Sequence, residues 1–355
     1  MFTRRIVCML VVCFLLNNCV KAQSPAQEAF DLRLAGKTIE AIKLLENAAA
    51  ADSNDTAVYF ELARDYFYTL IDCPDYKPDD VKQRQKTMKV KLKKAQKAID
   101  KAIKLDGKNA RYHYWAGEVE TYNAIYDAHF VWTMPAMPFE TRNAIKNYQK
   151  ALEIDPNFHQ ARLALMGCYD RLPPICGGDK KKAEHHAREL ELLDAVCGAK
   201  ARCEIQPRKN RQEKIAIWQK IVEQYPDNAR AHIGLAREYM HNGDLPQEDM
   251  QKSVEHINKA LKLDSSTCNI LLNLAHHYKR AKKYDKAEEA ISQFINIKPQ
   301  PCNPLLAIAY RQIADVQRKQ GKKQEAEISL EKANKLEPME WPTSRLPNED
   351  LFIAP

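Results

Sequence analysis

The six residues Ala260-Leu261-Lys262-Leu263-Asp264-Ser265 form an ending that recurs along the chain: a small residue, an apolar–polar–apolar triplet, an acid and a turn residue. Variants of it stand at 102–107, 151–156, 294–299 and 333–338, with a looser one at 190–195. From residue 265 to residue 299 is 34 residues, and the intervals 226 to 265 and 299 to 338 are each 39. Self-similarity at such a period indicates one supersecondary unit that buries its apolar face against its neighbours.

The most regular copy runs from Cys268 to Pro299 and predicts two amphipathic helices with a turn at Lys282-Lys283-Tyr284. Its inward residues are Leu271, Leu274, Ala275 and Tyr278 on the first helix, and Ala287, Ile291 and Phe294 on the second. This pattern resembles the tetratricopeptide repeat (TPR), a 34-residue helix–turn–helix unit. The resemblance implies an all-α fold, a right-handed TPR-type solenoid of about eight helix pairs, whose function is binding and whose ligand the fold does not name.

The chain begins like a secretory signal. Residues 1–22 combine Arg4 and Arg5, an apolar run from Ile6 to Leu16 and a small-x-small site ending at Ala22. Eleven apolar residues are short for a membrane span, which takes about 20. Three alternatives stay open: cleavage near Ala22, a lipoprotein anchored in the membrane through Cys19, or an uncleaved anchor. We expect an extracytoplasmic (periplasmic or secreted) location.

The repeats predict one solenoid over residues 23–338, followed by an extended tail at 339–355. Two insertions are expected, near 72–94 and 126–139, and a degenerate unit at 194–226. The second insertion is an apolar, aperiodic loop with its large side chains at Phe130, Trp132, Met134, Met137 and Phe139. Such a loop either packs on the solenoid or offers a partner-binding surface.

Seven of the ten cysteines lie beyond residue 22. Export permits disulfides, and an odd number leaves at least one thiol unpaired within the chain. Cys168 and Cys176 flank a proline break and are candidates to pair, as are Cys176 with Cys197 or Cys203. Burial as small apolar side chains in helix seams is the other interpretation.

The resemblance places ligands on the first helices, at positions 2, 5, 9, 12 and 13 of each repeat. Carried onto the last three units, these are Arg230, Ile233, Arg237, Met240 and His241; Asn269, Leu272, His276, Lys279 and Arg280; and Ile308, Arg311, Asp315, Arg318 and Lys319. This surface is basic, so it predicts a groove for an acidic protein or peptide, with a solvated charged face as the alternative. Asn273 matches one place of the family's chaperone-tail clamp, but Ile233 and Arg237 replace its Lys and Asn.

Other functions find less support. The formal charge is +8, of which residues 1–22 supply three, and no RNA-binding motif accompanies it, so we expect no nucleic-acid partner. Adjacent histidines at 185–186 and 276–277 point about 100° apart on a helix and do not chelate a metal by themselves. Catalytic signatures such as a nucleophile elbow or a phosphate loop are absent. We therefore expect neither a cofactor nor a metal, and no enzymatic activity.

The sequence thus predicts a non-catalytic protein- or peptide-binding scaffold or adaptor in an extracytoplasmic assembly. The alternative is an accessory protein of a periplasmic solute-transport system, which would hold a small ligand or a substrate-binding protein. An apolar pocket along the solenoid axis would favour that alternative over a charged groove.

Overall fold

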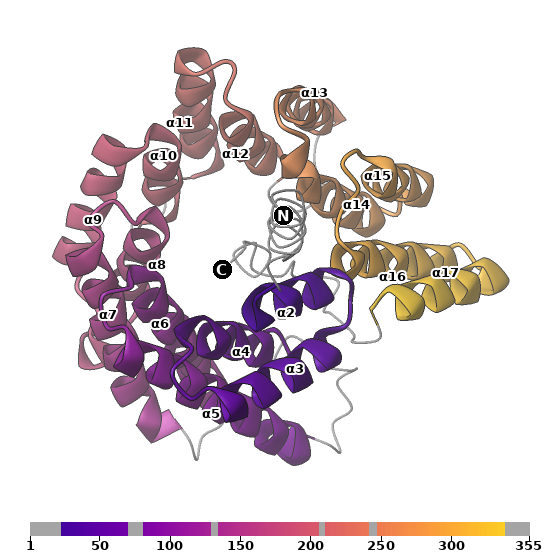
Figure 1. The fold of residues 1–355 in the computed structure, drawn as a ribbon. Coiled ribbons are helices and arrows are strands. Elements are labelled where there is room, and N and C mark those ends of the chain that lie inside the picture. The colour runs from indigo at the N-terminus through magenta and orange to yellow at the C-terminus, as the bar shows by residue number, and fades with distance from the viewer. Residues whose placement is uncertain (1–22, 70–80, 129–133, 206–209, 241–246, 338–355) are drawn as a thin grey trace, which may run out of the picture.

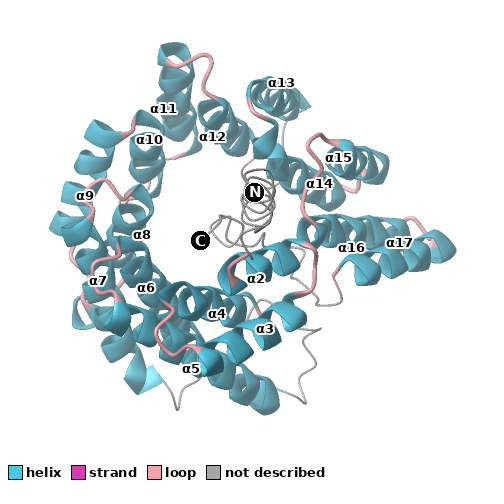
Figure 2. Ribbon diagram, in the orientation of Figure 1, coloured by secondary structure: helices cyan, strands magenta, loops and turns pink. Residues whose placement is uncertain are grey.

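The computed structural model describes residues 23–69, 81–128, 134–205, 210–240 and 247–337. Within these ranges the chain forms sixteen α-helices and three short 3-10 helices, with no strand. Figure 2 shows the helices joined by short loops. The predicted all-α, right-handed TPR-type solenoid is confirmed. The predicted signal at 1–22 and the tail at 339–355 lie outside the described residues.

The helices fall into eight consecutive antiparallel pairs. The first helices of the pairs are α2 (Pro25–Leu34), α4 (Thr56–Tyr68), α6 (Ala110–Ala128), α8 (His159–Arg171), α10 (Ala195–Glu204), α12 (Ala229–Tyr239), α14 (Ile270–Arg280) and α16 (Asn303–Lys319). The second helices are α3 (Thr38–Ala51), α5 (Val81–Leu105), α7 (Met137–Ile154), α9 (Lys180–Leu193), α11 (Arg211–Gln224), α13 (Gln247–Leu263), α15 (Tyr284–Asn296) and α17 (Lys323–Leu336). Figure 1 shows α6, α8 and α10 on the inside of the curve and α7, α9 and α11 outside them.

Turn and cap residues explain where these helices begin and end. Gly36, Lys282 and Gly321 take positive φ angles of 74°, 56° and 82° in the turns within the first, seventh and eighth pairs. Glycine adopts this left-handed conformation without a steric penalty. Asp179 caps α9 by accepting from two backbone N–H groups, and Asn210 and Glu213 form a capping box at α11.

The two expected insertions contain more helix than the sequence suggested. Residues 81–94, assigned to the first insertion, are the opening turns of the 25-residue helix α5. In the second, α6 continues to Ala128 and α7 begins at Met137. The prediction that all of 126–139 forms an irregular loop was therefore wrong. Pro138 lies in the first turn of α7, where its missing N–H has no intrahelical partner to lose.

Glycines allow neighbouring helices to approach closely. A Cβ atom added at Gly234 of α12 would lie 2.3–2.4 Å from the ring of Trp218 on α11. Trp218 is only 5% exposed and anchors a small apolar cluster of α10, α11 and α12. No side chain larger than hydrogen therefore fits at this crossing without moving the indole.

Replacing Gly234 with alanine is expected to lower the free energy of unfolding by about 1–3 kcal/mol, because the added methyl overpacks the seam. Urea unfolding followed by circular dichroism measures the change. Gly167→Ala on α8 is the matched control. Its added Cβ would meet nothing closer than 3.8 Å, so better helix propensity should raise stability by about 0.5–1 kcal/mol. Equal effects of the two substitutions would contradict the packing argument.

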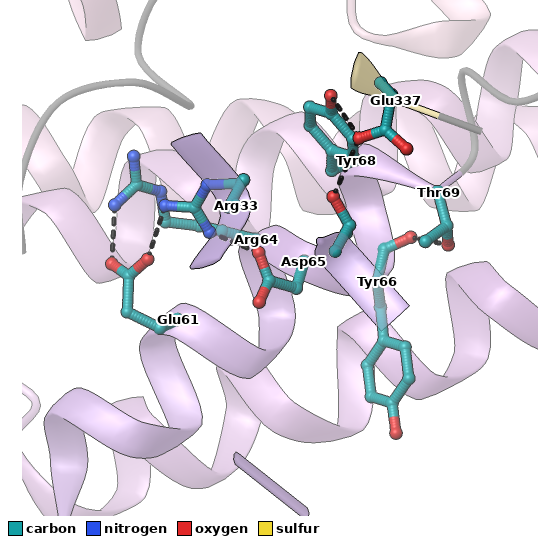
Figure 3. A network of polar contacts seen from close by, with 9 residues as sticks. Arg33, Glu61, Arg64, Asp65, Tyr66, Tyr68, Thr69 and Glu337 are labelled. Atoms are coloured by element: carbon teal, nitrogen blue, oxygen red, sulfur yellow. Dashed lines mark hydrogen bonds and ion pairs between the residues drawn. The ribbon is translucent and has the colours of Figure 1, made fainter. Parts of the chain in front are cut away.

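Four charged side chains of α2 and α4 are buried together (Figure 3). Arg33 pairs with Glu61 (Nη2–Oε2 2.7 Å) and with Asp65, and Arg64 pairs with Glu61; all four side chains are fully buried. Burial alone would lower the pKa of Arg33, but the carboxylates of Asp65 and Glu61 outweigh it and raise that pKa. Burial raises the pKa of Asp65, against the opposing effect of the Arg33 guanidinium, and burial lowers the pKa of Arg64. We call these four residues the buried quartet.

The two ends of the solenoid meet (Figure 1). Asn303 at the start of α16 donates from Nδ2 to the carbonyl oxygen of Ala35 over 3.0 Å. The hydroxyls of Thr38 and Tyr68 donate to Oε2 of Glu337 over 3.3 and 3.5 Å, as Figure 3 shows for Tyr68. These contacts join residues 268 to 299 positions apart, so the first and last pairs close the solenoid into a ring.

Candidate functional site

A large cavity of the described structure lies on the inner wall of the ring, and none of its lining comes from the last two pairs of helices. Its volume is about 1010 Å³, and its lining comes from α6, α7, α8, α10 and α12. A second cavity of about 430 Å³ continues it towards α14. Both are lined by Leu163, Cys197, Lys200, Glu204, Arg230 and Arg237. We call the two together the inner-wall cavity.

One part of the inner-wall cavity is apolar and aromatic. Tyr114, Tyr148 and Leu163 contribute to it from α6, α7 and α8. The Tyr148 hydroxyl donates to Oε1 of Glu118 over 2.8 Å and lies 2.9 Å from the Thr121 hydroxyl. Burial raises the pKa of Tyr148 well above its usual range, with Glu118 adding to the effect. This wall therefore presents a neutral phenol among apolar side chains.

The other part is charged, and its charges are largely paired with one another. Arg230 reaches Oδ2 of Asp194 over 3.2 Å and Sγ of Cys197 over 3.0 Å, and Arg171 reaches Glu204 over 3.0 Å. Burial alone would raise the pKa of Asp194, but the Cys197 N–H and the Arg230 guanidinium outweigh it and lower that pKa. Among the described residues, Lys200 has no ion-pair partner.

The lining of the inner-wall cavity is balanced in charge. Five basic residues line it (Arg171, Lys200, Lys214, Arg230 and Arg237) and so do five acidic ones (Glu118, Asp194, Glu204, Glu238 and Asp264). The prediction of a basic groove was based on the lysines and arginines of the first helices. It did not include the acids that face them from neighbouring helices. A ligand at this wall meets both signs of charge beside an apolar surface.

The residues predicted for the groove have different fates in the structure. Arg230, Arg237 and Asn269 line the inner-wall cavity. Ile233, Met240, Leu272 and Ile308 are buried in the core, because their repeat positions face the seams between helices here; of these four, Ile233 also lines the smaller cavity. Arg311 is also buried and donates from Nη2 to the carbonyl oxygen of Glu337 over 2.6 Å, so its guanidinium does not lie in an open groove.

The other predicted groove residues form a smaller polar group on α14 and α16. Lys279 pairs with Asp315 over 2.6 Å, and Arg318 with Glu327 over 3.1 Å. His276 is half-buried; burial lowers its pKa, with Lys279 and Arg280 adding to the effect. Asn273 is half-buried, Arg280 and Lys319 are exposed, and His241 lies outside the described residues. Acids therefore neutralise two of the cations on which the basic groove depended.

The predicted interaction loop is only partly described. Phe130 and Trp132 lie outside the described residues, and Met134 belongs to a 3-10 turn over Met134–Ala136. Met137 lines the inner-wall cavity, whereas the side chain of Phe139 is 71% exposed on the first turn of α7. The described part of the loop thus contributes Met137 to the cavity wall.

The candidate disulfides are not formed. Cys168, Cys176, Cys197 and Cys203 are free, as are the other two cysteines of the described residues. Cys176 is the buried last residue of the 3-10 turn η3 (Pro174–Cys176), while Cys168 and Cys197 line the cavity. Burial raises the pKa of Cys168 to about 12, with Glu118 adding to the effect, and burial also raises that of Cys197. Both are neutral thiols at pH 7, which disfavours them as nucleophiles.

The sequence contained a signal for the wall residues that were missed. The repeat positions used for the last three pairs also fall on Tyr114, Glu118 and Thr121 in the third pair, and on Gln160, Leu163 and Arg171 in the fourth. All six line the inner-wall cavity. Lys200 and Glu204 had no such signal, because they lie on the degenerate fifth unit, where the repeat register is lost.

Comparison with known sequences identifies the repeat. Residues 266–335, which span α14 to α17, match the family model of the tetratricopeptide repeat. The chain is a tetratricopeptide repeat protein. No protein of curated function matches this TPR chain.

Solved structures with similar helical arrangements are distant in sequence. The human IFIT1 dimer with m7Gppp-AAAA is 14% identical, with 91% of this TPR chain and 79% of that chain covered and a TM-score of 0.42. A tetratricopeptide repeat protein from Parabacteroides merdae is also 14% identical, with coverages of 88% and 91% and a TM-score of 0.38. MamA is 19% identical, with coverages of 58% and 94% and a TM-score of 0.27. None of these similarities bears on the ligand of this chain.

Two further absences hold within the described ranges. No group of three or more His, Cys, Asp or Glu side chains there is arranged to hold a metal ion. No helix there is long and apolar enough to cross a membrane.

Proposed function

We propose that this TPR protein is a binding scaffold that holds a segment of another protein in the inner-wall cavity. The observation that carries the proposal is the continuous cavity from α6 to α14, in which apolar and paired charged side chains stand side by side. Ligand sites are concave, largely apolar and supplied with a few placed polar groups. The N-terminal segment with Arg4, Arg5 and the run to Leu16 supports an extracytoplasmic role for the scaffold.

The balanced lining suggests what the bound segment carries. Lys200, which has no ion-pair partner among the described residues, offers a site for a carboxylate of the partner. The apolar wall at Tyr114 and Leu163 offers a site for an apolar side chain. Since the cavity as a whole is neutral, we expect affinity to depend on shape and apolar contact, and to fall only modestly between low and physiological salt.

A pull-down with one matched pair of variants tests the proposal. The full chain, tagged, is used to capture partners from the extracytoplasmic fraction of its host, beside Leu163→Arg on the cavity wall and Leu192→Arg on α9. Leu192 is 82% exposed on the outer layer, so the two substitutions differ in place and not in kind. We expect Leu163→Arg to weaken capture at least about tenfold, because a charged side chain replaces an apolar contact.

Loss of the partner with Leu192→Arg and its retention with Leu163→Arg would contradict the proposal. A second pair, Lys200→Glu and Lys181→Glu, tests the carboxylate site, since Lys181 is exposed at the start of α9. Thermal unfolding by circular dichroism, run on every variant, separates loss of binding from loss of fold.

A small ligand is the second candidate function. The volume of about 1010 Å³ is as large as that of small-molecule pockets, and the aromatic wall at Tyr114 and Tyr148 suits a ligand of that size. This candidate corresponds to an accessory protein of a solute-transport system. Native mass spectrometry of the chain purified from its host distinguishes the two: a bound mass below about 1 kDa, lost in Leu163→Arg, would favour the small ligand.

A further inference from the structure

In the described structure the first and last pairs meet, so the inner wall faces the central opening of a ring. The size of such an opening follows from general helix geometry: eight helices spaced evenly at about 9–10 Å have their axes on a circle about 24 Å across. Helix and side chains occupy a radius of about 5–6 Å on each side, which leaves an opening of about 13 Å. Such an opening admits an extended chain or one α-helix, but not a folded domain of 100 residues, which is about 34 Å across.

The gap through which a domain could approach from the side is closed by a small set of contacts. The N-terminal side supplies Ala35, Gly36, Thr38 and Tyr68, and the C-terminal side supplies Asn303, Leu336 and Glu337. We call these seven residues the clasp. Gly36 is required at the clasp, because a Cβ there would lie 1.8 Å from the carbonyl oxygen of Leu336.

We infer that the clasp is a gate that decides which partners reach the inner-wall cavity. While it is closed, a partner enters as an unfolded or single-helical segment with a free end. When it opens, the same wall becomes accessible to a segment held within a folded domain. The inference rests on the proposed function for the site of binding, and adds to it the form in which the partner is admitted.

The clasp is weaker than the joints between consecutive repeats. Hydrogen bonds from Thr38, Tyr68 and Asn303 connect its two sides, and the first two, at 3.3 and 3.5 Å, are long. One hydrogen bond of this kind changes an opening equilibrium by roughly two- to tenfold. Because each repeat of a solenoid contacts only its neighbours, small changes of angle at several joints add up to an open ring without unfolding any pair.

Two glycine variants isolate the clasp. Gly36→Val opens it by forcing a side chain against Leu336. Gly321→Val is the matched control, since Gly321 has a similar positive φ of 82° in the turn between α16 and α17, but nothing lies within 4 Å of an added Cβ. Asn303→Ala is a milder opening variant that removes one hydrogen bond and leaves every turn intact. Small-angle X-ray scattering should show a larger radius of gyration for Gly36→Val than for Gly321→Val.

The binding test uses two peptide libraries displayed on phage. One presents random 16-residue peptides with a free end, and the other presents the same peptides within a loop of a folded domain. We expect the native ring to enrich free-ended peptides at least about tenfold over domain-held ones, and Gly36→Val and Asn303→Ala to narrow that preference while Gly321→Val keeps it.

The inference that the clasp is a gate would be overturned if the native ring enriched both libraries equally. Leu163→Arg is the control for this outcome, because loss of enrichment in that variant shows that the peptides bind in the inner-wall cavity. An unchanged preference in both clasp variants would overturn it as well. Enrichment that Leu163→Arg does not reduce, or no enrichment from either library, would count against the proposed function itself.

Discussion

Replacing Arg33 with methionine is expected to lower the free energy of unfolding by about 3–5 kcal/mol, because it removes the buried cation that pairs with Asp65 and leaves Glu61 with Arg64 alone. The Arg33 guanidinium contacts both Glu61 and Asp65, and all three side chains are fully buried. Methionine is close to arginine in length and fills the space, so the loss measures electrostatics more than packing. Urea unfolding followed by circular dichroism measures it, and hydrogen exchange in 25–68 locates it.

Arg188→Met is the matched control. Arg188 pairs with Glu184 one turn away on α9 over 3.2 Å, and its side chain is 66% exposed. Exposed pairs of this kind contribute about 0.3–0.5 kcal/mol, so the control should scarcely change stability. Adding Asp65→Leu and Glu61→Leu to Arg33→Met removes the buried carboxylates and should recover part of the lost stability. The recovery is limited by Arg64, because Glu61→Leu takes away the carboxylate with which it pairs. An Arg33→Met protein as stable as the Arg188→Met protein would contradict the role given to the buried quartet.

The second large effect is expected from Trp115→Ala, which should lower the free energy of unfolding by about 3–5 kcal/mol. Trp115 is 2% exposed and packs edge-on against Phe67, with ring centroids 5.4 Å apart. The guanidinium of Arg64 lies 5.5 Å from its ring centroid, so the same indole also supports the buried quartet. The substitution therefore removes apolar contacts between α4 and α6 and a favourable partner of a buried cation.

Two comparisons make this second prediction specific. Trp115→Phe keeps an aromatic face and should cost less, about 1–2 kcal/mol. Tyr225→Ala removes an aromatic side chain that is 45% exposed beyond the end of α11, and should stay within about 0.5 kcal/mol of the native value. Unfolding in urea ranks the three variants. A Trp115→Ala protein no less stable than Tyr225→Ala would show that the α4–α6 seam does not depend on the indole.

Local features of the sequence were enough to predict the repeat architecture. The turn expected at Lys282-Lys283-Tyr284 lies where α14 ends and α15 begins, and the residues expected to face inward in that copy are buried. These features are readable because caps, left-handed turn residues and apolar periodicity act within one helix or between neighbours. The predicted irregular loop was longer than the observed one. The prolines at 135 and 138 suggested irregular structure, although helical turns lie on both sides of them.

The candidate site was predicted less completely. Arg230, Arg237 and Asn269 were found because the repeat register places the same helix positions on the inner wall. The basic character expected of that wall was not found, since Asp194 and Glu204 approach its arginines from other helices. Arg311 looked like a groove residue by its position, but the end of α17 covers it. Pairing of charges between helices depends on their relative placement, which no single repeat encodes.

The sequence by itself determined the unit: a helix, a turn and a second helix, repeated with the small residues that let the pairs stack. Only the tertiary structure decided that eight such units close into a ring, so that Thr38 meets Glu337 across 299 positions, and Ala35 meets Asn303. Each repeat adds a small rotation to the one before it, and the closure depends on the sum of those rotations. The same sum sets the width of the opening and the charges that face one another across the inner-wall cavity.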